Sequence, residues 1–434
     1  MTGVAVARRS QLVKWQTLNV TLLVTGYTGY YLCRSNLSVT MPLIIRELAG
    51  RGISPSAAQV TLGSIASLGV LAYALGKFPS GSLADVFGGR RNFLFGMGGS
   101  IAFTLLFAIS GAIPIFTLAW MGNRLVQSLG WAGAVKIISR WFTFQRYGTV
   151  MGIISLSYLF GDAAARQFMG LLITAGLGWR GVFLTTAVVL TVLLLACTWL
   201  RESPSQVGER EPSANPDNLF GRTATNPKPV SLGELLRPFF GSGVFWLACA
   251  LSLGTTILRE TFNLWTPTYF TQSTGMSAGQ AAGTSALFPL FGGVSVILCG
   301  WLSDRLGRGG RAGILLGGLS LAGFVLLVMA TGAMHDSRTL PVVLVTLVAF
   351  LVVGPYSFLG GAVALDFGGK QGSGTASGII DGVGYLGGVL SGDSMARISV
   401  SHGWGGAFLV LAVVAFLSSL AAAAFLRQER RIGV

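Results

Sequence analysis

Two arginines, Arg34 and Arg259, are the residues of this sequence whose type and spacing best suit the binding of an anion. They are 225 residues apart, and each lies inside a long apolar stretch. A charge at bilayer depth costs at least roughly 2.5–3.5 kcal/mol, so an ionisable residue kept there is a functional candidate. A guanidinium offers its donors in a planar fork that fits a phosphate or a carboxylate. Two arginines facing one cavity would bind such an anion together.

The alternative for these arginines is a structural role, in which each is neutralised by an acid of its own. Glu260 directly follows Arg259 in the sequence. Adjacent residues of a helix point about 100° apart, however, so we expect Glu260 to be a poor partner. The pattern therefore favours anion binding.

Tyrosines and a lysine accompany Arg34 at helical spacing. In the first apolar stretch, positions i, i+4, i+7 and i+11 hold Tyr27, Tyr31, Arg34 and Ser38. In the second stretch, Tyr73 and Lys77 are one helical turn apart. Residues at these intervals share one face of a helix. Because hydroxyls facing lipid would lack partners, we expect either a polar cavity or tyrosines packed between helices with each hydroxyl bonded to a carbonyl.

Two acid–arginine pairs at i, i+4 spacing lie in later apolar stretches, Asp162–Arg166 and Asp393–Arg397. This spacing permits an ion pair within one helix, which lowers the cost of burying both charges. The spacing favours a structural ion pair in each case. The alternative is that Asp162 and Arg166 line a cavity or take part in proton coupling.

Asp381 and Arg124 lack an oppositely charged residue one helical turn away in the sequence. Asp381 could pair with Lys77 or carry a proton. Arg124, in the fourth apolar stretch, could line the cavity. Both are candidates for the polar interior because of the cost of a charge at bilayer depth.

The composition indicates what kind of protein holds these residues in its apolar stretches. The chain has 434 residues, of which 52% are hydrophobic and 10% charged, whereas soluble proteins carry about 25% charged residues. The net charge of +15 comes from basic residues between the apolar stretches. This distribution is typical of cytoplasmic loops of a membrane protein, and it argues against nucleic acid as a partner.

Cysteine and histidine give no sign of a reactive centre. The cysteines lie in apolar stretches without paired spacing, at Cys33, Cys197, Cys249 and Cys299. The two histidines lie in loops, and no nucleophile motif is present. We expect no disulfide, metal, cofactor or enzymatic activity.

Twelve stretches of about 20 apolar residues are long enough to cross a bilayer. They predict an all-α membrane protein with twelve transmembrane helices in two pseudo-symmetric six-helix bundles, over residues 1–200 and 242–434. The polar stretch 201–241 between them predicts a linker. The span number is even, and the arginine-rich loops lie on the same side as the termini. We therefore expect both termini in the cytoplasm. The membrane we expect is a bacterial cytoplasmic membrane.

Three motifs recur in both halves of the sequence. GlyThrValMetGlyIleIle (148–154) recurs as GlyThrAlaSerGlyIleIle (374–380), GlyTrpArgGlyValPheLeu (178–184) as GlyTrpGlyGlyAlaPheLeu (403–409), and Asp85 as Asp304. Their offsets are 226, 225 and 219, which indicates a parallel repeat that gives Arg34 and Arg259 equivalent positions. Asp85, Arg90 and Asp304 lie in the repeated loop, where we expect them to brace helix ends during conformational change.

The loop Asp-x-x-Gly-x-Arg-Arg at 85–91 is similar to that of the major facilitator superfamily. TyrThrGlyTyrTyrLeuCysArg (27–34), TyrAlaLeuGlyLysPhe (73–78) and ArgGluThrPheAsnLeuTrp (259–265) resemble the organophosphate:phosphate antiporter family of that superfamily. So do segments 298–304, 364–366, 374–378, 384–388 and 403–408. The resemblance covers nearly the whole chain apart from the linker.

The resemblance implies a monomer that exchanges inorganic phosphate for a phosphorylated small metabolite by alternating access. It also implies that phosphate is coordinated by Arg34 and Arg259. The residues that would line the pathway are Tyr27, Tyr31, Tyr73 and Lys77.

Several positions depart from the pattern of the family. Ser35 stands where a lysine is usual, and Leu264 and Pro289 stand where acids are usual. GlyAsp (161–162) stands near the usual histidine of glycerol 3-phosphate carriers, which speaks against that substrate. Lys77 is then freer to meet a substrate anion or Asp381.

Two other functions stay open. Residues 34–39 and Arg124 also resemble the anion:cation symporters, which implies proton-coupled uptake of an organic anion such as a sugar acid, with Asp381 or Asp162 as the proton carrier. The second is a transport-inactive sensor of sugar phosphates that signals to a membrane partner.

Overall fold

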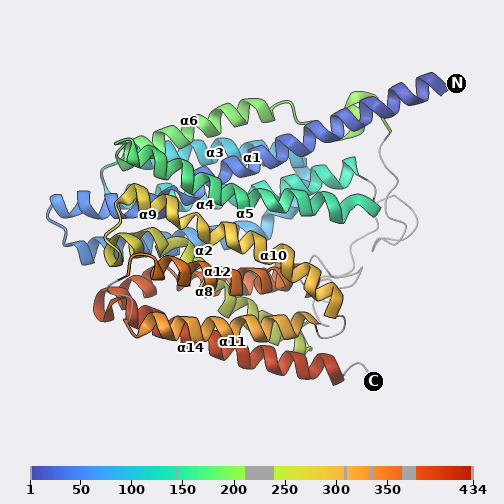
Figure 1. Cartoon of the computed structure of the whole chain (residues 1–434). Helices are drawn as coiled ribbons and strands as arrows, with labels where there is room; N and C mark the ends of the chain where they lie inside the picture. Colours follow the sequence, from blue (N-terminus) through green and yellow to red (C-terminus); the bar gives the residue numbers. More distant parts are fainter. Residues whose placement is uncertain are drawn as a thin grey trace. The chain divides into compact units, whose positions relative to one another are not determined.

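The computed structural model describes residues 2–142, 144–210, 239–306, 310–332, 337–363 and 378–431. Every regular element among these residues is a helix, as Figure 1 shows. The helices of the first half are α1 (Thr2–Gly50), α2 (Pro55–Phe87), α3 (Gly89–Ile109), α4 (Ile113–Trp141), α5 (Phe144–Thr174) and α6 (Trp179–Cys197), followed by the short 3₁₀ helix η1 (Pro204–Val207).

The second half begins with α8 (Gly243–Ser273), and it continues with α9 (Ala278–Ser285), α10 (Leu287–Leu306), α11 (Gly310–Ala330) and α12 (Leu340–Phe358). The π-helical turn η2 (Leu359–Val363) extends α12. A helix over 378–389 precedes α14 (Asp393–Arg431), in which Gly403 has φ 69° and divides two helical segments. A positive φ is readily adopted by glycine, which explains the break at this position.

The described helices account for twelve spans when α9 and α10 are taken as one, α14 is divided at Gly403, and its first part is joined to the helix over 378–389. Seven described segments are long and apolar enough to cross a membrane. The other long helices are α1, α4, α5 and α8. They are less apolar because they carry the charged residues that the sequence singled out, and such helices need a polar surface inside the protein. The predicted all-helical membrane fold is confirmed.

By their contacts, the described residues form two compact units. Unit 1 comprises Met1–Asn36, Ala72–Ala165 and Arg180–Ala224, and unit 2 comprises Leu37–Leu71, Arg166–Trp179 and Thr225–Val434. Both units therefore contain parts of α1, α2 and α5. The predicted division into bundles 1–200 and 242–434 with a linker stays a prediction, and most of the linker lies outside the described residues.

The core of unit 1 is built around α3 and α4. Phe93 and Trp141 are fully buried there with apolar residues of α1, α5 and α6. The Tyr30 hydroxyl donates to the Phe93 carbonyl at 2.6 Å. Gly96 and Gly130 leave the space for this side chain, since a Cβ on Gly96 would lie 2.3 Å from the Tyr30 hydroxyl and one on Gly130 would lie 2.9 Å from its ring. These contacts hold α1 and α4 in the positions from which their charged residues project.

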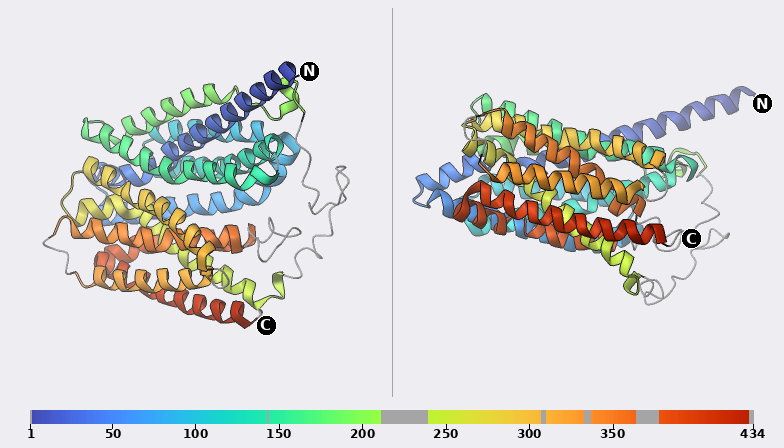
Figure 2. Two further views of the ribbon diagram at one scale, coloured as in Figure 1. Left: turned by 45° about the vertical axis from the view of Figure 1, so that its right-hand side comes forward. Right: turned by 60° about the horizontal axis from the view of Figure 1, so that its bottom comes forward.

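Unit 2 has its main helix contacts between α11 and α14 and between α10 and α12. Both views in Figure 2 show α11 and α14 side by side. Residues of α1 and α2 also belong to this unit: the Ser64 hydroxyl donates to Asp393 Oδ1 at 2.5 Å, and the Asp393 amide donates to the Ser67 hydroxyl at 2.9 Å. Gly63 and Gly392 touch through their backbones, because a Cβ on Gly63 would lie 2.8 Å from the Gly392 carbonyl oxygen.

Candidate anion-binding site

In unit 1, the arginine of α1 lies against the tyrosine of α2. The guanidinium carbon of Arg34 is 4.4 Å from the ring centre of Tyr73 and 5.4 Å from that of Tyr31. Tyr73 is buried. These are cation–π distances, and such a contact stabilises a guanidinium without requiring a hydrogen-bond acceptor.

Two further cations surround the same Tyr73 ring. Lys77 Nζ lies 5.4 Å from its centre, and the guanidinium carbon of Arg124 lies 5.3 Å from it. Arg124 also lies 5.9 Å from the ring centre of Trp120 on its own helix. Of the residues that the sequence proposed, the structure thus brings Arg34, Tyr73, Lys77 and Arg124 together.

The remaining tyrosines of the predicted stripe belong to an aromatic cluster. Tyr27 contacts Tyr31 edge-on at 6.1 Å between ring centres and Trp131 at 5.3 Å, and Trp131 contacts Tyr158 at 6.0 Å. The sequence did not single out Trp131 or Tyr158. A signal for Trp131 was available, because it precedes the aromatic residue Tyr356 by 225 residues, the repeat offset.

Asp162 and Arg166 have different surroundings. The Ser35 hydroxyl donates to Asp162 Oδ1, and both residues are buried in unit 1. Arg166 belongs to unit 2, where Nη2 donates to the Asn263 carbonyl at 2.8 Å and Nη1 to the Ser285 hydroxyl at 3.3 Å. An ion pair between Asp162 and Arg166 stays a prediction.

A proline explains why the Asn263 carbonyl can accept from Arg166. Pro267 lies inside α8 and has no N–H to donate to the carbonyl four residues earlier. The Ser38 hydroxyl of α1 also donates to the Asn263 carbonyl, at 2.8 Å. A backbone carbonyl released within a long helix is thus satisfied by side chains of two other helices.

In unit 2, Arg259 lies among two tyrosines and an acid. Its guanidinium carbon is 4.3 Å from the ring centre of Tyr356 and 5.9 Å from that of Tyr385. Nη2 donates to the Tyr385 hydroxyl at 3.3 Å and to Glu260 Oε1 at 2.7 Å. Neither tyrosine was among the residues that the sequence proposed.

The expectation that Glu260 is a poor partner of Arg259 was wrong. The two side chains form an ion pair at 2.7 Å, and both are largely buried. The angular argument concerned the directions of the Cβ atoms, whereas the long, flexible arginine side chain curves around the helix to reach the neighbouring carboxylate. In a site of low dielectric constant this contact stabilises both charges.

Asp381 lies against the π-helical turn. A Cβ on Gly360 would lie 2.4 Å from Asp381 Oδ1, so glycine is required at this close approach. Asp393 and Arg397 form the predicted pair within one helix, with Nε donating to Oδ2 at 2.7 Å. A pairing of Asp381 with Lys77 stays a prediction.

The repeated loop contains a capped helix end. Both carboxylate oxygens of Glu202 accept from the first backbone amides of α3, those of Gly89 at 2.9 Å and of Arg90 at 2.7 Å. The Arg90 side chain donates to the Thr198 carbonyl at 2.7 Å. The side chains of Asp85 and Asp304 lie outside the description, so the bracing role stays a prediction.

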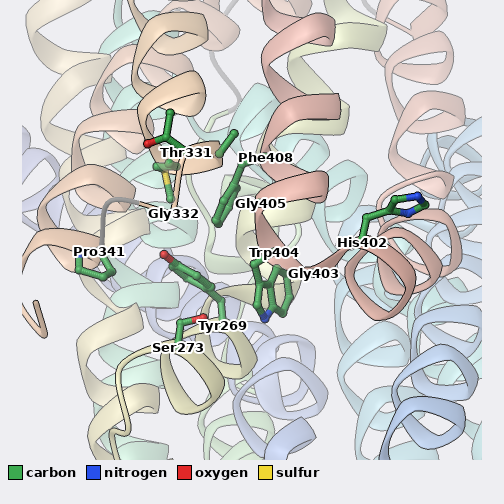
Figure 3. A pocket seen from close by; sticks show the side chains of 12 residues that line it. Tyr269, Ser273, Thr331, Gly332, Pro341, His402, Gly403, Trp404, Gly405 and Phe408 are labelled. Carbon is green, nitrogen blue, oxygen red and sulfur yellow. The ribbon is translucent and has the colours of Figure 1, made fainter. Parts of the chain in front are cut away.

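A cavity of about 340 Å³ in unit 2 is separate from Arg259. It lies where α8, α11 and α12 end or begin and where α14 is broken at Gly403, and its described lining includes no lysine or arginine. Figure 3 shows Tyr269, Trp404 and Phe408 around it, with the His402 imidazole directed away from them. The described residues also contain no cluster of three metal-ligating side chains.

The described geometry defines a helical membrane protein with cations held on aromatic rings inside its spans. A profile described as Major Facilitator Superfamily matches residues 23–392. The chain belongs to this superfamily of transporters, and it is a multi-pass membrane protein.

Curated relatives confirm the resemblance to the organophosphate:phosphate antiporter family. A probable hexose phosphate transport protein of Chlamydia pneumoniae is 26% identical, with 91% of this chain and 88% of the relative covered. The glycerol-3-phosphate transporter of Bacillus subtilis is 25% identical, with 89% and 86% covered. The membrane sensor protein UhpC of Escherichia coli is 25% identical, with 96% and 93% covered.

Solved structures share the fold. A D-xylose-proton symporter has a TM-score of 0.73 at 15% identity, with 94% of this chain and 97% of that chain covered. A bacterial homologue of the human lysosomal transporter Spinster, in an inward-facing and unoccupied conformation, has a TM-score of 0.69 at 14% identity, with 96% and 98% covered.

Proposed function

We propose that this protein is a secondary active transporter that exchanges a phosphorylated small metabolite for inorganic phosphate by alternating access. The observation that carries the proposal is the pair of repeat-equivalent arginines, each held on a tyrosine ring within a membrane helix. Arg34 lies over Tyr73 and Arg259 over Tyr356, at 4.4 and 4.3 Å. A ring face stabilises the guanidinium while its planar fork stays suited to an oxyanion.

The proposal assigns phosphate to Arg34 and Arg259, with Lys77 and the tyrosines Tyr27, Tyr31 and Tyr73 along the pathway. A bound anion would add charged hydrogen bonds to both guanidiniums, so closure around an occupied site is more favourable than closure around an empty one. This difference would couple each closure to a bound anion and so favour exchange over leak. The names of the Chlamydia and Bacillus relatives support a phosphate ester as the substrate.

We place the protein, within this proposal, in a bacterial cytoplasmic membrane as a monomer with both termini in the cytoplasm. A sensor of sugar phosphates is the second candidate, because UhpC proteins are among the relatives. A sensor would bind a phosphate ester without moving phosphate across the membrane.

The test is phosphate counterflow in proteoliposomes. Vesicles loaded with phosphate should take up labelled phosphate from outside, and Arg34→Lys or Arg259→Lys should lower the initial rate by about tenfold or more. A lysine keeps the charge but loses the paired hydrogen bonds, and a hydrogen bond to a charged group contributes about 1.5–3 kcal/mol. The matched control is Arg180→Lys, whose arginine donates to the Ser110 carbonyl at 3.3 Å.

Each alternative has its own result in this assay. Full exchange in Arg34→Lys would contradict paired recognition by the guanidinium. Uptake driven by an inward proton gradient into vesicles without phosphate would identify a proton-coupled symporter. Ester binding without any counterflow would identify a sensor.

A further inference from the structure

The cavity of about 340 Å³ in unit 2 is large enough for a small organic molecule, since such sites typically have volumes of roughly 300–1,000 Å³. Its lining comes from α8, α12, α14 and the end of α11. The side chains of Tyr269, Trp404 and Phe408 lie around it, as Figure 3 shows. None of these residues takes part in the proposed phosphate site, so the cavity is a candidate for a second ligand.

The three aromatic rings of the lining are packed at steep angles. The Tyr269 ring centre lies 5.4 Å from that of Trp404 and 5.0 Å from that of Phe408, with interplanar angles of 65° and 86°. The Trp404 N–H donates to Gln272 Oε1 at 2.8 Å, which fixes the orientation of the indole. The face of an aromatic ring carries a negative potential and attracts a cation, most strongly for tryptophan. The cluster therefore offers ring faces in two nearly perpendicular directions, which suits a rounded cation.

Three helical segments end at the cavity, each with its last residue in the lining. These residues are Ser273 of α8, Ala330 of α11 and His402, which precedes the break of α14 at Gly403. The His402 imidazole is directed away from the rings, and its Nδ1 lies 2.7 Å from the Ser401 hydroxyl. The C-terminus of a helix carries roughly half a negative charge, because its last carbonyls are not bonded within the helix. The three helix ends thus add their negative potential to that of the ring faces.

Two helical segments begin at the cavity, α12 and the second part of α14, and their N-termini carry partial positive charge. At α12 this effect is reduced by the residues of the first turn. The Leu340 amide donates to the Ser337 hydroxyl at 3.1 Å, and the next residue, Pro341, has no amide hydrogen. Three C-termini against two N-termini leave an excess of negative potential. Charge complementarity therefore favours a cation in this cavity.

We propose that the cavity binds a quaternary ammonium group, supplied by a small solute such as choline or by a lipid headgroup. Such a group has no N–H to donate, so ring faces and a diffuse negative potential recognise it without individual hydrogen-bond acceptors. A bound group would contact residues of α8, α11, α12 and α14 and hold these helices together. Binding should therefore raise the melting temperature of the protein. This site goes beyond the proposed phosphate exchange and does not depend on it.

The test compares choline with 3,3-dimethylbutan-1-ol, a neutral molecule of the same shape in which carbon replaces the nitrogen. The melting temperature of the full chain is measured in a maltoside detergent over a range of concentrations of each compound. We expect choline to reach its half-maximal effect at an at least about fivefold lower concentration, as a cation–π contact would give. In Phe408→Leu this ratio should fall to about half or less, because a ring face is lost while apolar bulk is kept. Phe416→Leu, on α14 but outside the lining, is the matched control and should keep the wild-type ratio.

Two results would overturn the proposal. They are equal half-maximal concentrations for choline and its neutral analogue in the wild type, and an unchanged ratio in Phe408→Leu. If Phe408→Leu does not fold, Thr331→Leu serves instead, because Thr331 lines the cavity from an exposed position and a larger side chain would fill part of it. Stabilisation by choline should then be weaker than in the wild type, and equal stabilisation would also reject the site.

Lipid nanodiscs distinguish the two sources of the ammonium group. In discs of phosphatidylglycerol, which has no ammonium group, free choline should raise the melting temperature. The same increase in discs of phosphatidylcholine would identify a free solute as the ligand. Its loss in phosphatidylcholine alone would identify a lipid headgroup that already fills the cavity. Absence of the effect in both lipids would contradict binding at this cavity.

Discussion

At the scale of single residues, the two arginines differ in their surroundings despite their equivalent positions in the repeat. Arg34 shares the Tyr73 ring with Lys77 and Arg124, whereas Arg259 forms an ion pair with Glu260. Breaking a buried pair by removing one partner costs about 3–5 kcal/mol, because the other charge is left uncompensated. Glu260 therefore stabilises Arg259 while no anion is present.

Replacement of Glu260 by glutamine should make the thermal stability of the protein depend more strongly on a bound anion. We expect a lower melting temperature without phosphate than in the wild type, and a larger increase on adding phosphate, because the anion would compensate Arg259. The measurement is thermal unfolding of the purified protein in detergent with and without phosphate. Glu47→Gln is the matched control, since its ion-pair partner Arg51 is a surface residue and the glutamine oxygen can still accept from Trp179 Nε1. An unchanged phosphate effect would contradict this role of Glu260.

At the scale of elements, the ends of helices are held by side chains that lie far away in the sequence. Glu202 follows α6, yet it caps the first turn of α3 with both carboxylate oxygens. An anion at a helix N-terminus is favoured by the unsatisfied amides and by the helix dipole. Arg140 of α4 approaches the same carboxylate at 3.9 Å. One residue thus joins the start of α3 and the end of α4 to the segment after α6.

Loss of this cap should destabilise unit 1. We expect Glu202→Ala to lower the stability by about 0.5–2 kcal/mol, as measured for other helix caps. Its melting temperature in detergent should fall relative to the wild type. Glu209→Ala removes a carboxylate from the same segment and should have little effect. Equal melting temperatures for the two variants would show that Glu202 does not stabilise the helix.

The elements were predictable from the sequence to a greater extent than the contacts. Apolar length and the recurring motifs predicted the spans, because crossing a bilayer demands about 20 apolar residues wherever the helix lies. The approach of Arg124 to Tyr73 depends on the rotation of α4, which Asn123 fixes through bonds to α3. A single sequence contains no signal for that rotation. The bond between Arg259 and Glu260 was missed because spacing describes backbone directions and not the reach of long side chains.

At the scale of the whole molecule, segments of both halves of the sequence meet within unit 2. Ser64 and Ser67 of α2 bond with Asp393, and Gly63 and Gly392 touch through their backbones. Gly170 of α5 is similarly close to Gly279 and Gly283 of α9. If transport proceeds by alternating access, contacts between halves must form and break in each cycle.

A disulfide across this contact should stop exchange. We expect the double variant Ser64→Cys, Asp393→Cys to lose phosphate counterflow on oxidation and to regain it on reduction, because the two side chains are in direct contact. Each single variant serves as a control and should be insensitive to the oxidant. The native cysteines Cys33, Cys197 and Cys249 are buried, and the single variants also control for the partly exposed Cys299. Undiminished transport in the cross-linked protein would contradict a need for this contact to open.

The contact between Gly63 and Gly392 has a thermodynamic consequence. Glycine has no side-chain rotamers, so bringing the two backbones together immobilises no side chain at these positions. The attraction comes instead from close van der Waals packing, as at other small-residue contacts between membrane helices. The equilibrium between the joined and separated forms should therefore have a small side-chain entropy change. A bulkier residue here would alter the temperature dependence of the transport cycle as well as its rate.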